Sequence, residues 1–231
     1  MAITATVTLN SAAGDLTTNA LSLSDSASLT KAGLATAIAN TSGLARKTTS
    51  STDQYTLFYA DEYTADKAHK IYLKNTETTA ALYFTIHIDD EPMGRLYAGD
   101  WALFPWSAAD GTKEVFTITF SGTWAAADTV TFDGVTINAD TAHATTAALV
   151  RATKYPNWTV SGSGSEAIFT SKRARADQEI DTSEWTIVDA GGSDAAIAVA
   201  TTTEGLDDAS NIKITPSTSA SHTLEYMLFY E

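Results

Sequence analysis

The four histidines are the side chains of this sequence best suited to bind a transition metal or to transfer a proton near neutral pH. They are His69, His87, His143 and His222, and they are scattered along the chain. None lies in the H-E-x-x-H spacing that places two imidazoles on one face of a helix to hold zinc. We therefore predict structural histidines, with no metal site and no general base among them.

Carboxylates gather in two segments. Residues 177–181 (DQEID) would place three carboxylates along one side of a strand, a ligand set of the kind that Ca²⁺ prefers. Basic residues at positions 172, 173 and 175 precede them, so a solvated edge of compensating charges is the interpretation we favour. Residues 89–91 (DDE) lack the D-x-[DN]-x-[DN]-G spacing of a calcium loop and are predicted to form a hairpin tip. No metal and no cofactor is expected.

Serine and glycine alternate over residues 161–165 (SGSGS). A hydrolase nucleophile would call for G-x-S-x-G, and a phosphate-binding loop would call for Gly-Lys-Ser/Thr before a helix. The segment fits neither pattern and is predicted to be a flexible turn. With no paired carboxylates and no nucleophile motif, we predict no catalytic residue.

Five tryptophans could offer flat apolar rings for stacking on a ligand such as a sugar. The candidates for contact with a glycan or a partner are Trp124, Trp158 and Trp185, which lie in the middle third of the chain. Packing in a hydrophobic core is the alternative, and it is the interpretation we favour for most of these rings.

Composition narrows the classes of partner. The chain has 231 residues and no cysteine, which excludes disulfides, thiolate metal sites and cysteine-based catalysis. The formal net charge of -14 and the pI near 4.5 argue against nucleic acid, whose phosphates require a Lys/Arg surface. No apolar run reaches the roughly 18 residues of a membrane span, and residues 1–7 do not resemble a signal peptide. We expect a soluble protein with protein partners.

The stretch 70–106 contains three predicted strands. Residues 70–74 and 82–88 alternate large apolar with polar side chains, the period-2 pattern of a strand with one buried face. Residues 101–106 (WALFPW) are nearly all apolar, which favours a place in the centre of a sandwich and not at a solvated edge. Small and β-branched residues dominate elsewhere, which indicates an all-β protein.

The connections in this stretch are predicted to be hairpins, at residues 75–79 and at residues 89–94 with their Pro and Gly. The apolar C-terminal residues 224–231 are predicted to pair with these strands, because such a strand left alone would promote aggregation.

The N-terminal part is predicted to contain a strand at residues 3–9, a turn, and a second strand or extended arm at residues 16–29. Residues 31–46 show no clear period. They could form a short helix at residues 34–38 or an extended segment that lies on a neighbouring subunit.

Residues 107–112 and 206–210 resemble linkers, and the segment between them has its own strand set. Asp133-Gly134 is a strong hairpin signal between two of those strands. Residues 141–154 are the best helix candidate, with four alanines and Leu149 on one predicted face. The predicted strands lie at residues 115–120, 129–132, 135–137, 158–160, 167–170 and 185–188.

Because residues 211–215 resume the alternation of the first part, we predict an inserted domain. The base would be a β-sandwich, resembling a jelly roll, made of residues 1–110 and 211–231, with residues 1–50 as an arm and first strands. The insert, residues 111–210, would be β-rich with one helix. Insertions of this kind succeed where loop ends are close together at the surface.

Three segments of the base carry a resemblance to a known group of proteins. Residues 94–106 (GRLYAGDWALFPW), with residues 71–75 (IYLKN) and 224–229 (LEYMLF), resemble small β-sandwich virion proteins of marine tailed bacteriophages. The likenesses, including that of the insert, cover most of the chain after Thr48.

The insert resembles a module that recurs in phage structural proteins. The module has a GDTVTI-like strand with a G-V hairpin, an Ala-rich helix, and two strands with a Gly/Ser turn. Residues 128–137, 145–152 and 158–171 match these parts in order. The chain departs from the module at Ala127-Asp128, where Gly-Asp is usual.

The resemblance implies a non-enzymatic virion structural protein, and within that class a capsid decoration (cement) protein that binds the capsid lattice and displays an outer domain. It would be assembled in the host cytoplasm and located in the virion. Its partners would be the major capsid protein or other virion proteins and further copies of itself, as a trimer or dimer. The alternatives are a tail or fibre adhesin that binds a host-surface glycan and, less favoured, a hydrolase of host-envelope material.

Overall fold

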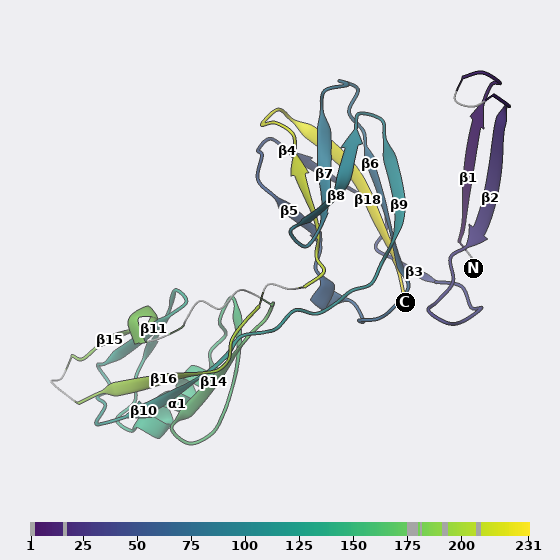
Figure 1. The fold of residues 1–231 in the computed structure, drawn as a ribbon. Coiled ribbons are helices and arrows are strands. Elements are labelled where there is room, and N and C mark those ends of the chain that lie inside the picture. Colours follow the sequence, from purple (N-terminus) through teal and green to yellow (C-terminus); the bar gives the residue numbers. More distant parts are fainter. Residues whose placement is uncertain (1–2, 16–17, 175–179, 181, 191–193, 207–208) are drawn as a thin grey trace. The chain divides into compact units, whose positions relative to one another are not determined.

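The computed structural model describes residues 3–15, 18–174, 180, 182–190, 194–206 and 209–231. Antiparallel strands dominate it, and a single α-helix occurs in the described part (Figure 1). The prediction of an all-β protein is therefore confirmed. The chain divides into a base unit, Met1–Ala109 with Ser210–Glu231, and an insert unit, Asp110–Ala209. These bounds lie within one residue of the predicted insertion.

The base unit contains two antiparallel sheets, a four-stranded one named here sheet I and a five-stranded one named sheet II. Sheet I has the order β5 (Tyr55–Phe58), β17 (Ile212–Pro216), β7 (Tyr83–Ile88), β8 (Glu91–Tyr97). Sheet II has the order β3 (Asn40–Thr41), β18 (His222–Tyr230), β6 (His69–Asn75), β9 (Trp101–Trp106), and β4 (Ala45–Thr49) also pairs with β18.

The two sheets form a sandwich because each has one apolar face. Every second residue of β6, from His69 to Asn75, is buried, as the period-2 alternation predicts. Aromatic rings meet across the layers. The ring centre of Phe58 in sheet I lies 5.6 Å from that of Tyr226 in sheet II, and the ring centres of Phe84 and His222 are 5.4 Å apart. The core of the base unit is therefore the space between the sheets.

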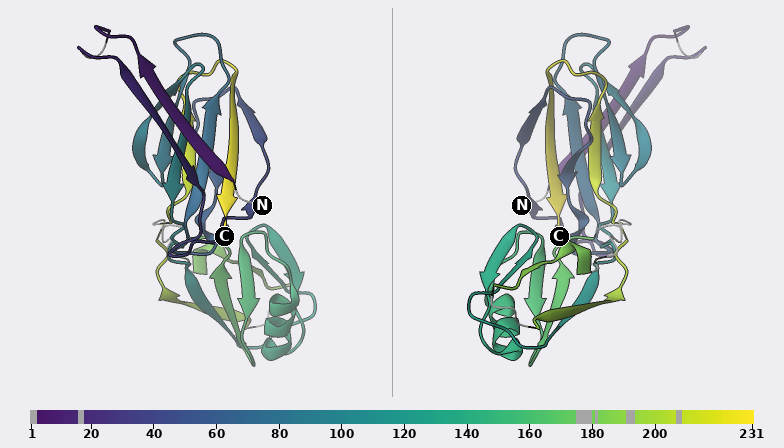
Figure 2. Two further views of the ribbon diagram at one scale, coloured as in Figure 1. Left: turned by 90° about the vertical axis from the view of Figure 1, so that its right-hand side faces the viewer. Right: turned by 90° about the vertical axis from the view of Figure 1, so that its left-hand side faces the viewer.

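Strands that follow the insertion complete both sheets. In sheet II, β18 pairs with β6 from Leu224 opposite Asn75 to Phe229 opposite Lys70. In sheet I, β17 pairs with β7 along its whole length. The left view of Figure 2 shows the yellow C-terminal strand between blue strands of the N-terminal half. The predicted role of residues 224–231 agrees with this pairing.

The two base residues that flank the insertion, Ala109 and Ser210, are hydrogen-bonded neighbours. The Ser210 N–H donates to the Ala109 carbonyl over 3.1 Å, and the Ala109 N–H donates to Ser210 Oγ over 2.8 Å. The Trp106 indole N–H donates to the Ser210 carbonyl over 2.7 Å. This neck, Trp106 to Ala109 with Ser210, allows a whole unit to be inserted without breaking the base sheets.

The insert unit has its own two sheets and core. One sheet has the order β13 (Trp158–Ser161), β14 (Glu166–Ser171), β10 (Val115–Ser121), β16 (Ala196–Thr203). The other has the order β12 (Val135–Asn138), β11 (Thr129–Phe132), β15 (Thr186–Val188). Stacked aromatic rings fill the core of the insert unit. The ring centres of Phe132 and Trp185 are 4.3 Å apart, and those of Phe116 and Phe169 are 5.0 Å apart.

The local signals in the insert are largely reproduced. Asp133 and Gly134 take φ of 49° and 74°, the left-handed pair that a tight two-residue hairpin requires. The helix α1 runs from His143 to Ala152. It buries Thr146, Ala147 and Val150, whereas Leu149 is 39% exposed, so the predicted face with Leu149 is wrong by about one residue.

Several predictions for the base are wrong. Strand β9 is the edge of sheet II and not its centre. Residues 75–79 cross from sheet II to sheet I and are not a hairpin, because β6 and β7 belong to different sheets. The residues predicted as one long turn after β7 contain most of strand β8. In the insert unit, strand β16 was not predicted.

The N-terminal strands form a separate hairpin. Strands β1 (Thr4–Ser11) and β2 (Leu21–Ser28) pair over eight residues each. Residues 31–46 continue as turns into β3 and β4, and the short helix offered as one alternative for residues 34–38 does not form. Gly33 and Gly43 take positive φ of 65° and 75°, so the chain turns on either side of that segment.

Candidate functional site

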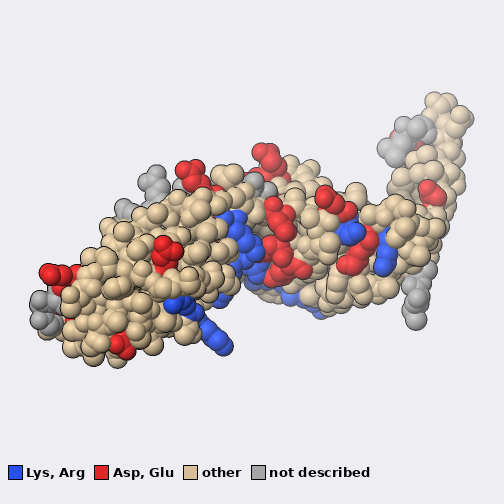
Figure 3. Space-filling view, turned by 90° about the horizontal axis from the view of Figure 1, so that it is seen from below, with Lys and Arg blue, Asp and Glu red and all other residues tan. Residues whose placement is uncertain are grey.

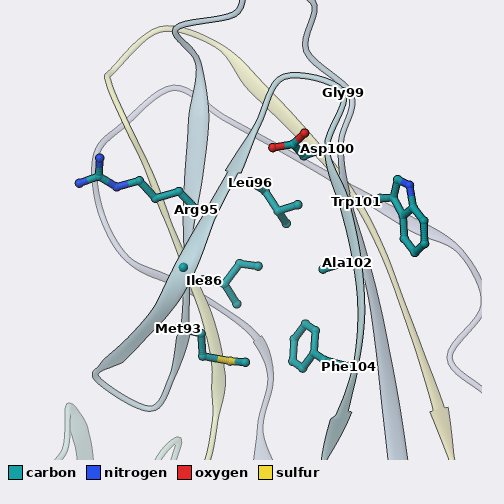
Figure 4. A pocket seen from close by; sticks show the side chains of 10 residues that line it. Ile86, Met93, Arg95, Leu96, Gly99, Asp100, Trp101, Ala102 and Phe104 are labelled. Carbon is teal, nitrogen blue, oxygen red and sulfur yellow. The ribbon is translucent and has the colours of Figure 1, made fainter. Parts of the chain in front are cut away.

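The candidate site of the base unit lies at the edge strands β8 and β9, one from each sheet. In the described part of the chain, β8 pairs with β7 alone and β9 with β6 alone. A groove of about 530 Å³ lies between these two edge strands. We call it the edge groove, and its lining comes from both sheets (Figure 4).

The floor of the edge groove is apolar. Figure 4 shows Ile86, Leu96, Ala102 and Phe104 directed into the space between β8 and β9, with Met93 directed toward Phe104. Ile86 and Leu96 are buried, whereas the Met93 side chain is 50% exposed. Apolar surface that is accessible at an unpaired sheet edge favours contact with another chain.

A β-bulge shapes one wall of the groove. The register of β7 and β8 shifts between Ile86 and His87, so that Ile86 faces Gly94 and His87 faces Pro92. The extra residue is Met93, which the bulge leaves outside the regular alternation. A Cβ built on Gly94 would meet nothing within 4 Å, so the groove has free space beside β8.

The turn that joins β8 to β9 is fixed by Asn75, which is fully buried. Its side-chain N–H₂ donates to the carbonyls of Leu96, over 3.0 Å, and Leu82, over 3.1 Å. Its backbone N–H donates to the Asp100 carbonyl, and its carbonyl accepts from the N–H of Gly99. One residue at the end of β6 thus holds the end of the edge groove.

The rim of the groove carries one cation and one anion. Arg95 points away from the groove and lies 4.6 Å from the ring centre of Tyr83. A hydrogen bond with Tyr97 is the main cause that raises the pKa of Arg95, so the group stays charged. Asp100 accepts a hydrogen bond from the Tyr97 N–H over 2.9 Å. The groove is therefore an apolar floor between two compensating charges.

No protein-family model, curated protein or solved structure matches this chain. The properties of the site must therefore come from its own residues. In the part of the chain that the structure describes, no helix is long and apolar enough to cross a bilayer.

The three predicted contact tryptophans do not reach the surface. Trp124, Trp158 and Trp185 are 2%, 3% and 5% exposed and belong to the core of the insert unit. A ring packed on both faces cannot stack on a sugar, so core packing, the favoured alternative, describes them. The tryptophan with most exposed surface is Trp101 of β9, at 53%, beside the edge groove.

The histidines do not meet one another. His69 and His222 are buried; a ring nitrogen of each hydrogen-bonds nearby, His69 Nε2 with the Thr64 carbonyl and His222 Nε2 with Ser217. His87 Nε2 lies 3.1 Å from the Thr215 hydroxyl. No group of three or more His, Asp or Glu side chains suited to a metal occurs among the described residues.

The carboxylates at the predicted hairpin tip have a structural partner. Asp89 and Asp90 each lie 3.0 Å from the Nζ of Lys213, whose side chain is 9% exposed. They hold a lysine across sheet I, which explains their spacing without calcium. Of the other acidic segment, residues 177–179 and 181 lie outside the described residues.

On the face drawn in Figure 3, Lys and Arg side chains gather near the middle beside Asp and Glu side chains, and most of the surface is uncharged. The edge groove was not predicted because it has no motif. Its one sequence signal is the apolar run 101–106, which fits a central strand as well as an edge strand beside a groove.

Proposed function

We propose that this chain is a non-enzymatic structural protein of a tailed bacteriophage particle, and that it decorates the capsid. The base unit would bind the lattice of the major capsid protein, and the insert unit would be the displayed part. The resemblance of residues 94–106 and of the insert to phage proteins suggests this function, and the architecture is compatible with it.

The observation that carries the proposal is the neck. A whole unit with its own core is joined to the base through one pair of hydrogen-bonded neighbours, Ala109 and Ser210. Both base sheets are complete without any strand of the insert. Such an architecture suits a protein whose base is bound to a surface while a second unit remains free for other contacts.

The mechanism would be the burial of apolar area across neighbouring shell subunits. Each Å² of apolar surface removed from water contributes about 25 cal/mol. A contact of modest size, repeated at every symmetry-related position, would raise the barrier to shell rupture in proportion to the number of copies.

The test is to purify particles of the virus that encodes the chain and to measure its copy number against the major capsid protein. We expect a fixed ratio set by the shell symmetry, and density for the base unit on the shell in an image reconstruction. Shells depleted of the protein should rupture at lower temperature. Density in the tail or fibre would favour the adhesin alternative, and absence from the particle would overturn both.

A further inference from the structure

The β1–β2 hairpin has one apolar face and one hydroxyl face. Leu9 lies opposite Leu23 and Val7 opposite Asp25 in the register, so these side chains share a face. The other face carries threonine and serine, with Thr6 Oγ1 and Ser26 Oγ 2.7 Å apart. This is the pattern of a hairpin with one side in a core and the other side in water.

The apolar face nevertheless has no cover in the described chain. Val7 is 40% exposed, Leu9 50%, Leu21 38% and Leu23 49%. The two strands form a sheet of their own. An isolated two-stranded hairpin is marginally stable in water, so a partner surface is required to hold its strands together.

The foot of the hairpin is attached firmly. Leu29 and Ile38 are buried, and the Ile38 N–H donates to the Leu29 carbonyl over 2.8 Å. The Ala32 N–H donates to the side chain of Glu231 over 2.6 Å. The exposed face thus belongs to an anchored arm and not to a frayed terminus.

We propose that the β1–β2 hairpin of one copy of this chain covers the edge groove between β8 and β9 of a second copy. Its apolar face would meet Met93, Ala102 and Phe104, and its hydroxyl face would remain in water. The hairpin strands would then supply the missing neighbours of the two edge strands. One contact accounts for both an uncovered apolar face and an unpaired sheet edge.

The dimensions fit. An eight-residue strand is about 26 Å long, and a two-stranded ribbon is about 10 Å wide, close to the usual spacing of two packed sheets. Such a face buries on the order of 500 Å² on each side, which is near the lower limit for a specific interface. In a ring each copy gives one hairpin and receives another, so the buried area per copy doubles.

Charge favours a second copy as the occupant. The chain has a net charge of -14, so most pairs of surfaces on two copies repel each other. Asp25 is the one charged residue in β1 and β2, and it lies on the apolar face opposite Val7, so in the docked arrangement it would lie at the rim beside Arg95. The groove rim carries Arg95 and Asp100, whose charges cancel. These are surfaces that two copies can bring together without a like-charge penalty.

The sheet order disfavours the alternative in which the hairpin covers the groove of its own chain. The hairpin connects to β3, and β3 and β9 are at opposite edges of sheet II, with β18 and β6 between them. A contact between different surfaces on identical copies closes into a ring or continues as a filament.

This contact between copies does not depend on the proposed function. The contact can be absent while the chain decorates a capsid, and the contact can form in a protein that does not.

The experiment uses engineered disulfides, since the chain has no cysteine. The full-length variants Leu9→Cys and Met93→Cys are mixed in equal amounts under mild oxidation. Both positions are 50% exposed, so neither change threatens the fold. We expect the mixed dimer at least ten-fold above the yield from Thr8→Cys with Met93→Cys, in which the cysteine lies on the hydroxyl face.

Three results would overturn the proposal. Predominant Leu9→Cys homodimers would mean that hairpins pack on each other. A Leu9→Cys/Met93→Cys double variant that closes within single chains at every concentration would place the hairpin on its own groove. A mixed-dimer yield no higher than the Thr8→Cys control would exclude docking. As an independent measurement, Leu9→Ser with Leu23→Ser should weaken self-association in sedimentation at least ten-fold.

Discussion

Replacement of Asn75 by Ala tests whether one buried amide holds the edge groove together. The side chain makes three hydrogen bonds: its N–H₂ donates to the carbonyls of Leu82 and Leu96, and its Oδ1 accepts from the Glu77 N–H over 3.0 Å. Each such bond contributes about 1 kcal/mol net, and a buried carbonyl left without a donor adds a further penalty. We expect Asn75→Ala to lower the free energy of unfolding of the base unit by about 3 to 4 kcal/mol.

A loss of that size lowers the melting temperature of a domain by roughly 10 °C. The measurement is unfolding in urea, monitored by hydrogen exchange and mass spectrometry. Peptides from β6 and β18 report on the base, and peptides from β10 and β14 report on the insert. Exchange should accelerate in the base peptides alone. Asn40→Ala is the matched control: Asn40 is exposed in β3 and should change stability by less than about 0.5 kcal/mol.

Asn75→Asp sharpens the test through its pH dependence. The new carboxylate would place an oxygen against the carbonyls of Leu82 and Leu96, which raises its pKa in the folded state because only the protonated form can donate. A raised pKa gives stability that is present below the unfolded value near 3.9 and is lost as pH rises. The variant should therefore be closer to wild type at pH 4 than at pH 7. A loss below about 1 kcal/mol for Asn75→Ala, or equal acceleration in both units, would refute the reasoning.

Three further outcomes are expected. Lys213→Ala should destabilise the base by about 1 kcal/mol, because it removes the partner of Asp89, whose side chain is 26% exposed, and the packing of the lysine stem. Asp90→Asn, at a 71% exposed side chain, should change urea unfolding little. Tyr155→Phe should be neutral or stabilising by up to about 1 kcal/mol, since the buried hydroxyl has no hydrogen-bond partner among the described residues. Burial raises the pKa of Tyr155, so wild-type stability should fall above about pH 10 and the variant should lose less in alkaline unfolding. The backbone hydrogen bond from Ala32, followed in size by the one from Ala68, lowers the pKa of Glu231. Glu231→Gln should therefore speed hydrogen exchange of the Ala32 amide above about pH 4.5. The difference from wild type should vanish as the pH falls through the lowered pKa of Glu231.

The sequence predicted the strands whose environment is set locally. β6, β7, β10 and β14 alternate strictly, and each has the buried face that the alternation requires. The insertion was visible because the linker-like residues 107–112 and 206–210 flank it and residues 211–215 resume the alternation of the base. Asp133-Gly134 predicted its hairpin because its left-handed φ values depend on those two residues alone.

Features that depend on sheet order were not predictable. An apolar run such as residues 101–106 suits a central strand or an edge beside an open groove, and the choice depends on which strands lie on either side. β8 begins with Glu91-Pro92 and contains Gly94, so its composition resembles a turn, yet pairing with β7 makes it a strand. The edge groove arises from strands of both sheets and therefore has no contiguous signal.

The hydrogen-bonded pair Ala109 and Ser210 has a consequence for how such chains diversify. A segment whose two ends begin side by side can be exchanged for any other folded segment with adjacent ends, and neither sheet of the host needs to be rethreaded. Relatives of this chain can accordingly share the sandwich and differ completely between these two residues. The same position is a natural place to graft a foreign module for display.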